Sequence, residues 1–264
     1  MRWLWIVLMG ACVHATAAES IEQVLERSQM MRLSQCPPAD AQSAAAQRVR
    51  HSMQRLTALA GADAPAVELV LVGGDLFAEA LLDRPGIAVS QAVGDLPEGE
   101  RLLLLAHELG HVRLAHATAL KALYRTHIPG EVRPETTNHV SAVLGQEAHA
   151  LSHRHEHEAD AYGYALVRSL GFGVDNAFAL LTRQGMQHDS ATHPGTRRRL
   201  AQLRMLEDSL AQQQAHPTNS PGLSGRSSGS PRSAAPASAA RRGLDQHCKQ
   251  QVPNRSARNG RHAA

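Results

Sequence analysis

Aromatic residues and cysteines are both scarce in this chain of 264 residues. Phe, Trp and Tyr together make up 3% of it, and it contains only 3 Cys. Hydrophobic residues as a whole reach 43%, which suits a globular protein with one sizeable core or two small domains. No internal repeat is present, and beyond the N-terminus no apolar run reaches the ~20 residues of a membrane-spanning helix. We therefore expect the mature body to be soluble or peripheral to a membrane.

Acidic residues are nearly missing from the C-terminal part. From Gly225 onward, eight Lys or Arg stand against a single acid, Asp245, in a chain of formal net charge +3. Residues 216–264 are rich in Ser, Pro, Ala, Gly and Arg, a composition that buries too little apolar surface to offset the entropy of ordering. We expect a disordered basic tail there. It either binds anionic lipid headgroups or cell-wall polyanions, or it only aids solubility; the expected export argues against nucleic acid.

The N-terminus has the pattern of a targeting segment. Met1-Arg2 is followed by an apolar stretch from Trp3 to Val13 and by the cleavage pattern Ala15-Thr16-Ala17. Residues 1–17 are therefore expected to be a signal peptide that directs the protein to the periplasm. Met9-Gly10-Ala11-Cys12 also resembles a lipobox, so an outer-membrane lipoprotein anchored through Cys12 is the alternative.

Cleavage after Ala17 would leave two cysteines, Cys36 and Cys248. In an oxidising compartment such a pair can form a disulfide. The two residues can equally be unrelated thiols, and the sequence leaves both interpretations open.

Between the two ends the sequence predicts an α+β fold that is mostly helical, with a small sheet. The capping-box pattern Ser20-Ile21-Glu22-Gln23 and the pattern Asp95-Leu96-Pro97-Glu98 each predict a helix start. Pro and Gly residues predict a loop at 121–145. Within a domain at 18–215 we expect helices at 20–33, 41–60, 95–120, 146–170, 175–184 and 192–213, and strands at 67–72 and 86–90.

The run LLLLAHELGHVRLAH at 102–116 contains the pattern His-Glu-x-x-His. Residues four apart on a helix share a face, so His107 and His111 can both direct ring nitrogens at one ion. Glu108 lies beside them, where the general base of a zinc peptidase lies. A buried helix that carries histidines by chance is the alternative in a chain with 16 His, so a third ligand is needed.

A second acidic and His-rich helix can supply that ligand. In RHEHEADAYG, residues 154–163, Glu156 and Asp160 are four apart and therefore on one face. Glu156 would complete a set of two imidazoles and one carboxylate with a position left open for water. Asp160 could accept the spare N–H of a ligating histidine and fix its tautomer. Taken alone, such a helix is more often a solvated face.

These motifs together resemble a known family. The chain is similar in four ordered segments to the HtpX- and BepA-like zinc metallopeptidases, which are gluzincins. These segments are HELGH at 107–111, Glu156–Gly163, GFGVDNAFALLTRQG at 171–185, and THPGTRRRL at 192–200 with its arginine at Arg199. The resemblance covers about residues 45–205. It implies a zincin-type domain, one Zn²⁺ per chain, and protein or peptide substrates. It also implies His107, His111 and Glu156 as ligands and Glu108 as the base.

Two parts of the resemblance leave alternatives open. His193 falls where the family has a histidine near the metal, so it would contact the oxyanion of the transition state, act as an inhibitory plug, or have no role. The segment 76–90, where the family has the strand that pairs with an extended substrate, matches only loosely.

The remaining histidines raise the possibility of a second metal. His149, His153 and Glu156 lie roughly on one helical face, although polar decoration of a cleft is the plainer interpretation. The sequence as a whole predicts an exported zinc endopeptidase, with a role in cell-envelope protein quality control. A zinc-stabilised chaperone or binding module is the alternative; oligomeric state and possible peripheral membrane association stay open.

Overall fold

The computed structural model describes residues 19–61 and 66–215. The expected signal peptide, Cys12, the basic tail and Cys248 lie outside these residues. Within them the expectation of a mostly helical α+β fold with a small sheet is confirmed. The helices are α1 (Ile21–Ser34), α2 (Ala44–Leu59), the 3₁₀ helix η1 (Gln91–Asp95), α3 (Glu98–Arg113), α4 (His116–His127), α5 (Pro134–Thr137), α6 (Ser141–Ser169), α7 (Val174–Arg183) and α8 (Thr196–Ala215).

The sheet has three short strands, β1 (Glu68–Val72), β2 (Ala78–Ala80) and β3 (Gly86–Ser90). They are ordered β1-β3-β2, with β1 parallel and β2 antiparallel to β3. β3 is buried along its whole length, as a central strand should be. The residue pattern did not predict β2, which has only three residues, Ala-Glu-Ala, of types that are depleted in strands. This missed strand is an edge of the sheet and lies against α3.

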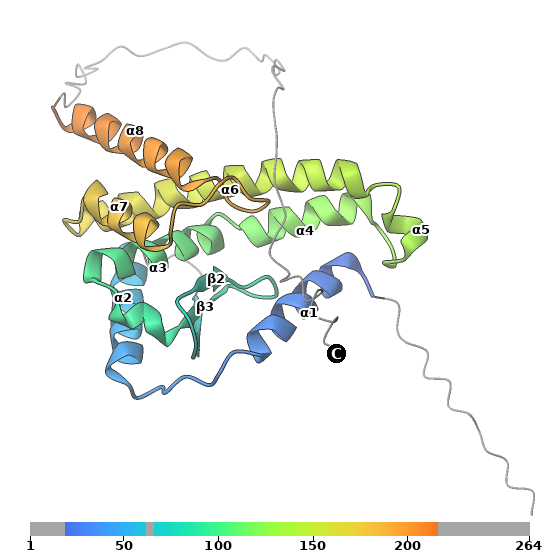
Figure 1. Cartoon of the computed structure of the whole chain (residues 1–264), viewed down its shortest axis with the longest axis horizontal. Coiled ribbons are helices and arrows are strands. Elements are labelled where there is room, and N and C mark those ends of the chain that lie inside the picture. The colour runs from blue at the N-terminus through green and yellow to red at the C-terminus, as the bar shows by residue number, and fades with distance from the viewer. Residues whose placement is uncertain (1–18, 62–65, 216–264) are drawn as a thin grey trace, which may run out of the picture.

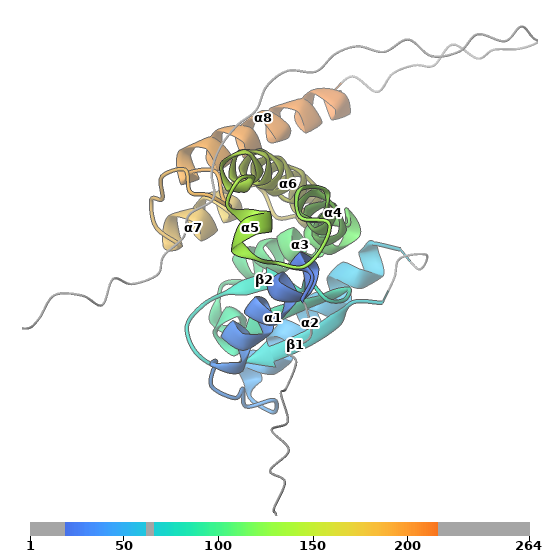
Figure 2. The same cartoon turned by 90° about the vertical axis from the view of Figure 1, so that its right-hand side faces the viewer.

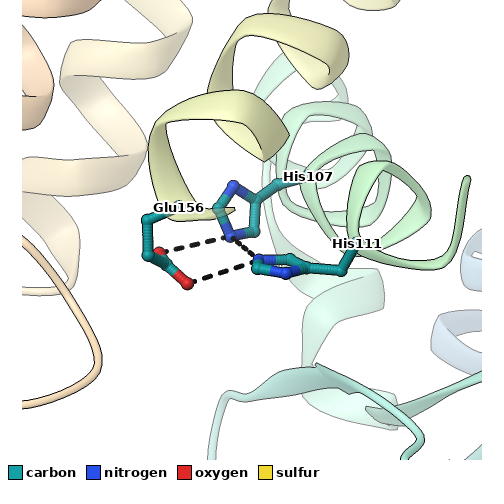
Figure 3. A group of neighbouring side chains, drawn as sticks. All are labelled: His107, His111 and Glu156. Carbon is teal, nitrogen blue, oxygen red and sulfur yellow. Dashed lines mark hydrogen bonds and ion pairs between the residues drawn. The ribbon is translucent and has the colours of Figure 1, made fainter. Parts of the chain in front are cut away.

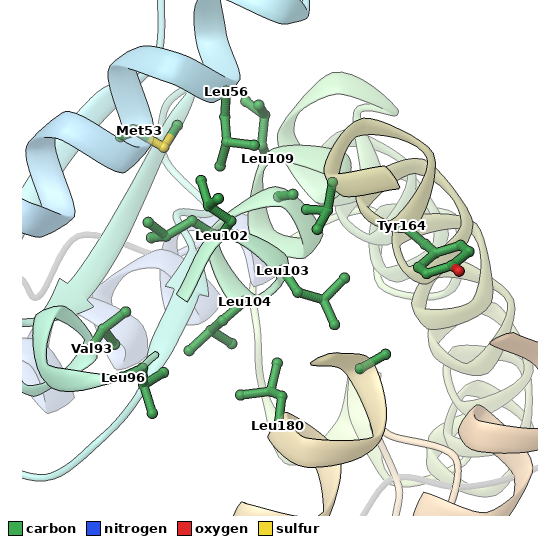
Figure 4. Close-up of a cluster of buried hydrophobic side chains, with 14 of the residues drawn as sticks. Met53, Leu56, Val93, Leu96, Leu102, Leu103, Leu104, Leu109, Tyr164 and Leu180 are labelled. Atoms are coloured by element: carbon green, nitrogen blue, oxygen red, sulfur yellow. The ribbon is translucent and has the colours of Figure 1, made fainter. Parts of the chain in front are cut away.

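Helix α3 runs through the middle of the molecule. The sheet, α1 and α2 lie on one side of it, and α6, α7 and α8 lie on the other (Figures 1 and 2). Its four successive leucines, at 102–105, are all buried. Figure 4 shows that Leu102, Leu103 and Leu104 point in different directions, so the helix is covered on several sides. The core around it contains Met53 and Leu56 of α2, Ile87 and Val89 of β3, and Leu180 of α7.

Helices α3 and α6 approach each other backbone to backbone. A Cβ atom on Gly163 of α6 would lie 2.8 Å from the backbone nitrogen of His107, and one on Gly110 of α3 would lie 3.1 Å from the Cα of Ala159. Only glycine leaves room at such distances. The two glycines therefore set how closely the His-Glu-x-x-His motif faces Glu156.

The expectation of one continuous helix from 95 to 120 is wrong. Asp95 ends the 3₁₀ helix η1, and α3 begins at Glu98 after Pro97. At its other end α3 stops at Arg113, and Ala115 adopts a left-handed conformation with φ of 54° before α4 begins. The helix is interrupted there although no Gly or Pro stands at the break.

The expected loop at 121–145 is also wrong. Helix α4 continues to His127, α5 fills 134–137, and α6 begins at Ser141. Pro129 lies in the short connection between α4 and α5, and Pro134 is the first residue of α5, where proline fits the first turn of a helix. None of the described helices is both long and apolar enough to cross a membrane.

The N-terminal helix α1 is fixed by its own cap and by contacts to α4. Ser20 and Gln23 form the expected capping box, and Lys121 of α4 forms an ion pair of 2.7 Å with Glu26. The buried side chain of Gln29 lies along β2, where its Nε2 donates to the carbonyl of Ala80 over 2.9 Å and its Oε1 accepts from the N–H of Leu82 over 2.8 Å. Gln29 thus covers one end of the edge strand as a further strand would.

Candidate metal centre

His107, His111 and Glu156 converge between α3 and α6 (Figure 3). The Nε2 atoms of the two histidines lie 3.1 Å apart. Glu156 Oε1 lies 3.3 Å from the Nε2 of His111, and Glu156 Oε2 lies 3.5 Å from the Nε2 of His107. His107 and Glu156 are buried, at 6% and 5% exposure. The helical spacing and the close approach of α6 bring the three side chains together.

The spacing of the three ligand atoms fits a zinc ion. Bonds of 2.0–2.2 Å in tetrahedral directions place neighbouring ligand atoms roughly 3.3–3.5 Å apart, close to the distances of 3.1, 3.3 and 3.5 Å found here. The buried Oε2 of Glu156 accepts no hydrogen bond from any described residue, and its cationic neighbour Arg199 is 3.9 Å away. A buried carboxylate oxygen without a donor can still accept a metal, and two imidazoles with one carboxylate are a typical zinc set.

Asp160 and Arg199 hold the ring of His107 from behind. The Nδ1 of His107 lies 2.9 Å from Asp160 Oδ1. Arg199 of α8 donates to both oxygens of Asp160, over 2.6 and 2.8 Å. Because a carboxylate only accepts, His107 donates through Nδ1 and keeps the lone pair of Nε2 for a metal.

The charges around Asp160 and Glu156 keep both carboxyls ionised. Burial alone would raise the pKa of Asp160, but Arg199 and His107 outweigh it and lower that pKa to about 2. Burial likewise opposes ionisation of Glu156, yet His107, His111, His193 and Arg199 hold its pKa well below the usual range. The sequence motif contained Arg199 without indicating this pairing, because α6 and α8 are distant in the chain.

Glu108 faces the space beside the converging ligands. It is buried, and burial raises the pKa of its carboxyl, although His107 and His111 oppose that effect and the backbone N–H of Ala80 donates a hydrogen bond to it. Glu108 lines two cavities, of about 490 and 280 Å³. The larger extends past Leu103 and Leu104 of α3, and the smaller extends towards α4.

His193 lies at the same place, in the connection between α7 and α8. Its ring lines both cavities, and its Nε2 is 3.6 Å from Glu156 Oε1. The Nδ1 of His193 is within 2.8 Å of the Thr192 hydroxyl, and the side chain is 51% exposed. His193 therefore stands at the mouth of the site, where it can reach the ligands or a substrate.

A second group of His and Glu side chains lies next to the first. His116, His155 and Glu158 bring ligand atoms within 4.8 Å of one another. The rings of His116 and His155 are stacked, with centroids 3.9 Å apart and planes 5° apart. An imidazole binds a metal in its own ring plane, and two parallel planes share no point, so these stacked rings cannot coordinate one ion together. Burial lowers the pKa of His116 to about 3 and that of His155 to about 4.

The second-metal set considered from the sequence is not assembled. His149 and His153 stack on each other, with centroids 4.4 Å apart, and the Nε2 of His153 lies 3.0 Å from the carbonyl of Ser190. Glu156 instead belongs to the group with His107 and His111. The sequence could not indicate His116 as a neighbour of His111, because that contact depends on the turn at Ala115.

Comparison with known proteins places this site in a family. No curated protein matches the chain significantly. The model of peptidase family M48 matches residues 43–207, more than half of the chain and all of the residues that converge between α3, α6 and α8. The chain therefore belongs to peptidase family M48, a family of zinc-dependent metallopeptidases.

Proposed function

We propose that this chain is a zinc endopeptidase in which His107, His111 and Glu156 hold the ion and Glu108 is the general base. The observation that carries the proposal is the convergence of the three ligand atoms, at 3.1, 3.3 and 3.5 Å, beside the carboxyl of Glu108. Membership of family M48 supports the hydrolysis of peptide bonds.

The residues divide the chemistry among them. Zinc, when bound, polarises the scissile carbonyl and lowers the pKa of water. Glu108 takes a proton from the attacking water and passes it to the leaving amine. Burial raises the pKa of the Glu108 carboxyl, which makes its carboxylate a stronger base for taking the proton from water. Asp160 keeps the proton of His107 on Nδ1 throughout.

The position of Glu108 between the two cavities supports cleavage within a chain rather than at its end. The segment Asp75–Ala78 lines the larger cavity, and Ala78–Ala80 with Leu82 lines the smaller one. An extended peptide that pairs with the outer edge of this segment would continue on both sides of Glu108. Gln29 already occupies the backbone groups of Ala80 and Leu82, so the stretch before Ala80 is the one open to pairing.

The direct test replaces Glu108 with Gln. The variant should bind zinc like the wild type but lose casein hydrolysis, because an amide cannot take the proton. Glu98→Gln, at the exposed start of the same helix, is the matched control and should stay active. Substantial casein hydrolysis by purified Glu108→Gln, made in a host without the native enzyme, would refute the role of Glu108 as general base. If the wild type still hydrolyses casein in the presence of a chelator, the reaction does not depend on zinc.

His193 has two possible roles at the mouth of the site. It either donates to the oxyanion of the transition state or blocks the open position of the metal. His193→Ala separates them, since lost activity supports the first role and gained activity supports the second. Unchanged activity would exclude both.

We further propose that the enzyme is exported and acts on envelope proteins. The support is the pattern at 1–17, and cell fractionation tests it, because a protein found only in the cytoplasm would contradict export. Radioactive palmitate distinguishes a lipoprotein anchored through Cys12 from a cleaved soluble form. Deleting 216–264 and finding unchanged membrane association would remove the anionic-surface role of the tail.

A further inference from the structure

We propose that Glu158 and His116 form a hydrogen-bonded relay that orients His111 and fixes its tautomer. The inference rests on the proposed function, in which His111 is a zinc ligand. Asp160 does this for His107, and the relay would be the corresponding partner of the second imidazole. His116 and Glu158 are positioning residues in this account and do not touch the substrate.

The contacts form an unbroken line from Glu158 to the metal centre. Glu158 Oε2 lies 3.1 Å from the Nε2 of His116. The Nδ1 of His116 lies 3.0 Å from the Nδ1 of His111. The other nitrogen of His111, Nε2, faces Glu156 and His107. Both distances in the relay are those of ordinary hydrogen bonds.

Only one arrangement of protons on His116 and His111 leaves the Nε2 of His111 free to bind a metal. An ionised carboxylate only accepts, so the Nε2 of His116 carries the proton that is donated to Glu158. In a neutral imidazole the other nitrogen is then an acceptor, and the Nδ1 of His116 accepts from the Nδ1–H of His111. With its proton on Nδ1, His111 keeps the lone pair of Nε2 for the ion.

The alternative proton arrangement would close the site. In the other neutral tautomer of His116, with its proton on Nδ1, the lone pair of Nε2 would face the carboxylate of Glu158. The Nδ1–H of His116 would then donate to His111, and the His111 proton would lie on Nε2. That proton would point at the Nε2 of His107, 3.1 Å away, and His111 could not bind a metal there. The relay therefore selects between a ligating and a non-ligating His111.

The surroundings of His116 keep its ring in the required plane. His116 is buried, and the parallel ring of His155 stacks on it with centroids 3.9 Å apart. The turn at Ala115 carries His116 back towards His111. In an uninterrupted helix, residues five apart point about 140° away from each other. The stacking of His155 on His116 prevents the two rings from binding one ion together. The same stacking fixes the ring plane of His116, so that its nitrogens face Glu158 and His111.

The test measures how His111 binds metal, separately from catalysis. In the full-length chain, His116→Phe keeps an aromatic ring for the stack but removes both relay nitrogens. We expect zinc to bind about 10–100-fold more weakly, as when other partners of ligating histidines are removed. We also expect a shifted visible spectrum with Co²⁺ in place of zinc. His116→Asn, whose amide oxygen can accept from His111, should restore part of the affinity.

Two further variants make every outcome decisive. His155→Phe keeps the stack and the relay and should bind zinc like the wild type. Glu158→Ala is the second relay variant, for use if His116→Phe fails to fold. Its side chain is 46% exposed, so the fold should tolerate the change. We expect zinc binding to weaken towards the lower end of the same range. Wild-type affinity and an unchanged Co²⁺ spectrum in either relay variant would overturn the relay.

His111→Ala distinguishes this failure from that of the proposed function. If His111→Ala binds zinc like the wild type, His111 is not a ligand and the proposed function itself fails. If His111→Ala loses zinc while the relay variants keep it, only the relay is wrong.

Discussion

Two groups of two histidines and one glutamate lie side by side in this molecule, yet only one has the geometry of a metal site. In the first, the rings of His107 and His111 meet at 71° and their Nε2 atoms point at the same space as Glu156. In the second, His116 and His155 are stacked at 5°. The difference teaches that proximity of ligand atoms is insufficient and that the lone pairs must converge.

The two geometries have different backbone causes. The first group forms where two long helices touch through Gly163 and Gly110. The second forms where the left-handed residue Ala115 separates α3 from α4. We expect the first to bind zinc and the second to support it, and each of the following changes tests that contrast.

The largest effect should come from exchanging the carboxylates of the two groups for amides. Glu156→Gln removes a ligand and should abolish both stoichiometric zinc binding and peptide hydrolysis. Glu158→Gln should retain one zinc per chain and most of the activity. Elemental analysis of the two purified variants checks this. Equal zinc content in both would break the comparison.

The next largest effect should follow from Asp160→Asn, which weakens the fixed support of His107. We expect about 10–100-fold weaker zinc binding. Stability should also fall by about 3 kcal/mol, because the partly buried Arg199, 14% exposed, loses the nearer of its two counter-charges and keeps only Glu156 at 3.9 Å. Chelator competition and urea unfolding measure the two effects. Asp208→Asn, an exposed change on α8, is the control, and a similar result for both variants would contradict a special role of Asp160.

A smaller effect should come from forcing α3 and α6 apart. Gly163→Ala places a Cβ 2.8 Å from the backbone of His107, so we expect a loss of about 1–3 kcal/mol of stability together with reduced activity. Gly145→Ala in the same helix meets nothing within 4 Å and should stabilise by about 0.5–1 kcal/mol. Thermal unfolding of both variants decides, and a stable, fully active Gly163→Ala would show that the close approach is unnecessary.

The smallest effect should come from removing one of the two histidines of the second group. His155→Phe should leave one zinc per chain even at a several-fold excess of zinc, because the stacked ring coordinates nothing. Equilibrium dialysis gives the stoichiometry. A wild type that binds two ions and a variant that binds one would overturn the contrast between the groups.

The local spacing of residues predicted much of the first group. His107 and His111, like Glu156 and Asp160, are four apart, and helical periodicity is a property of the sequence alone. The pairing of Asp160 with Arg199 needed the docking of α8 on α6, a contact between segments far apart in the chain.

The features that the sequence did not predict depend on tertiary contacts. The turn at Ala115 adopts a left-handed backbone conformation in a residue that rarely takes it, so the pattern favoured a continuous helix. β2 exists because β3 pairs with it and α3 covers it, whereas its three residues, Ala-Glu-Ala, have low strand propensity. The second group could not be predicted either, because it depends on the turn at Ala115.

Anomalous X-ray diffraction at the zinc edge from crystals of the zinc-loaded chain tests the central claim most directly. We predict a single strong peak about 2.0–2.2 Å from the Nε2 atoms of His107 and His111 and from a Glu156 oxygen. A principal peak among His116, His155 and Glu158, or a Glu156 side chain turned away from the ion, would contradict it.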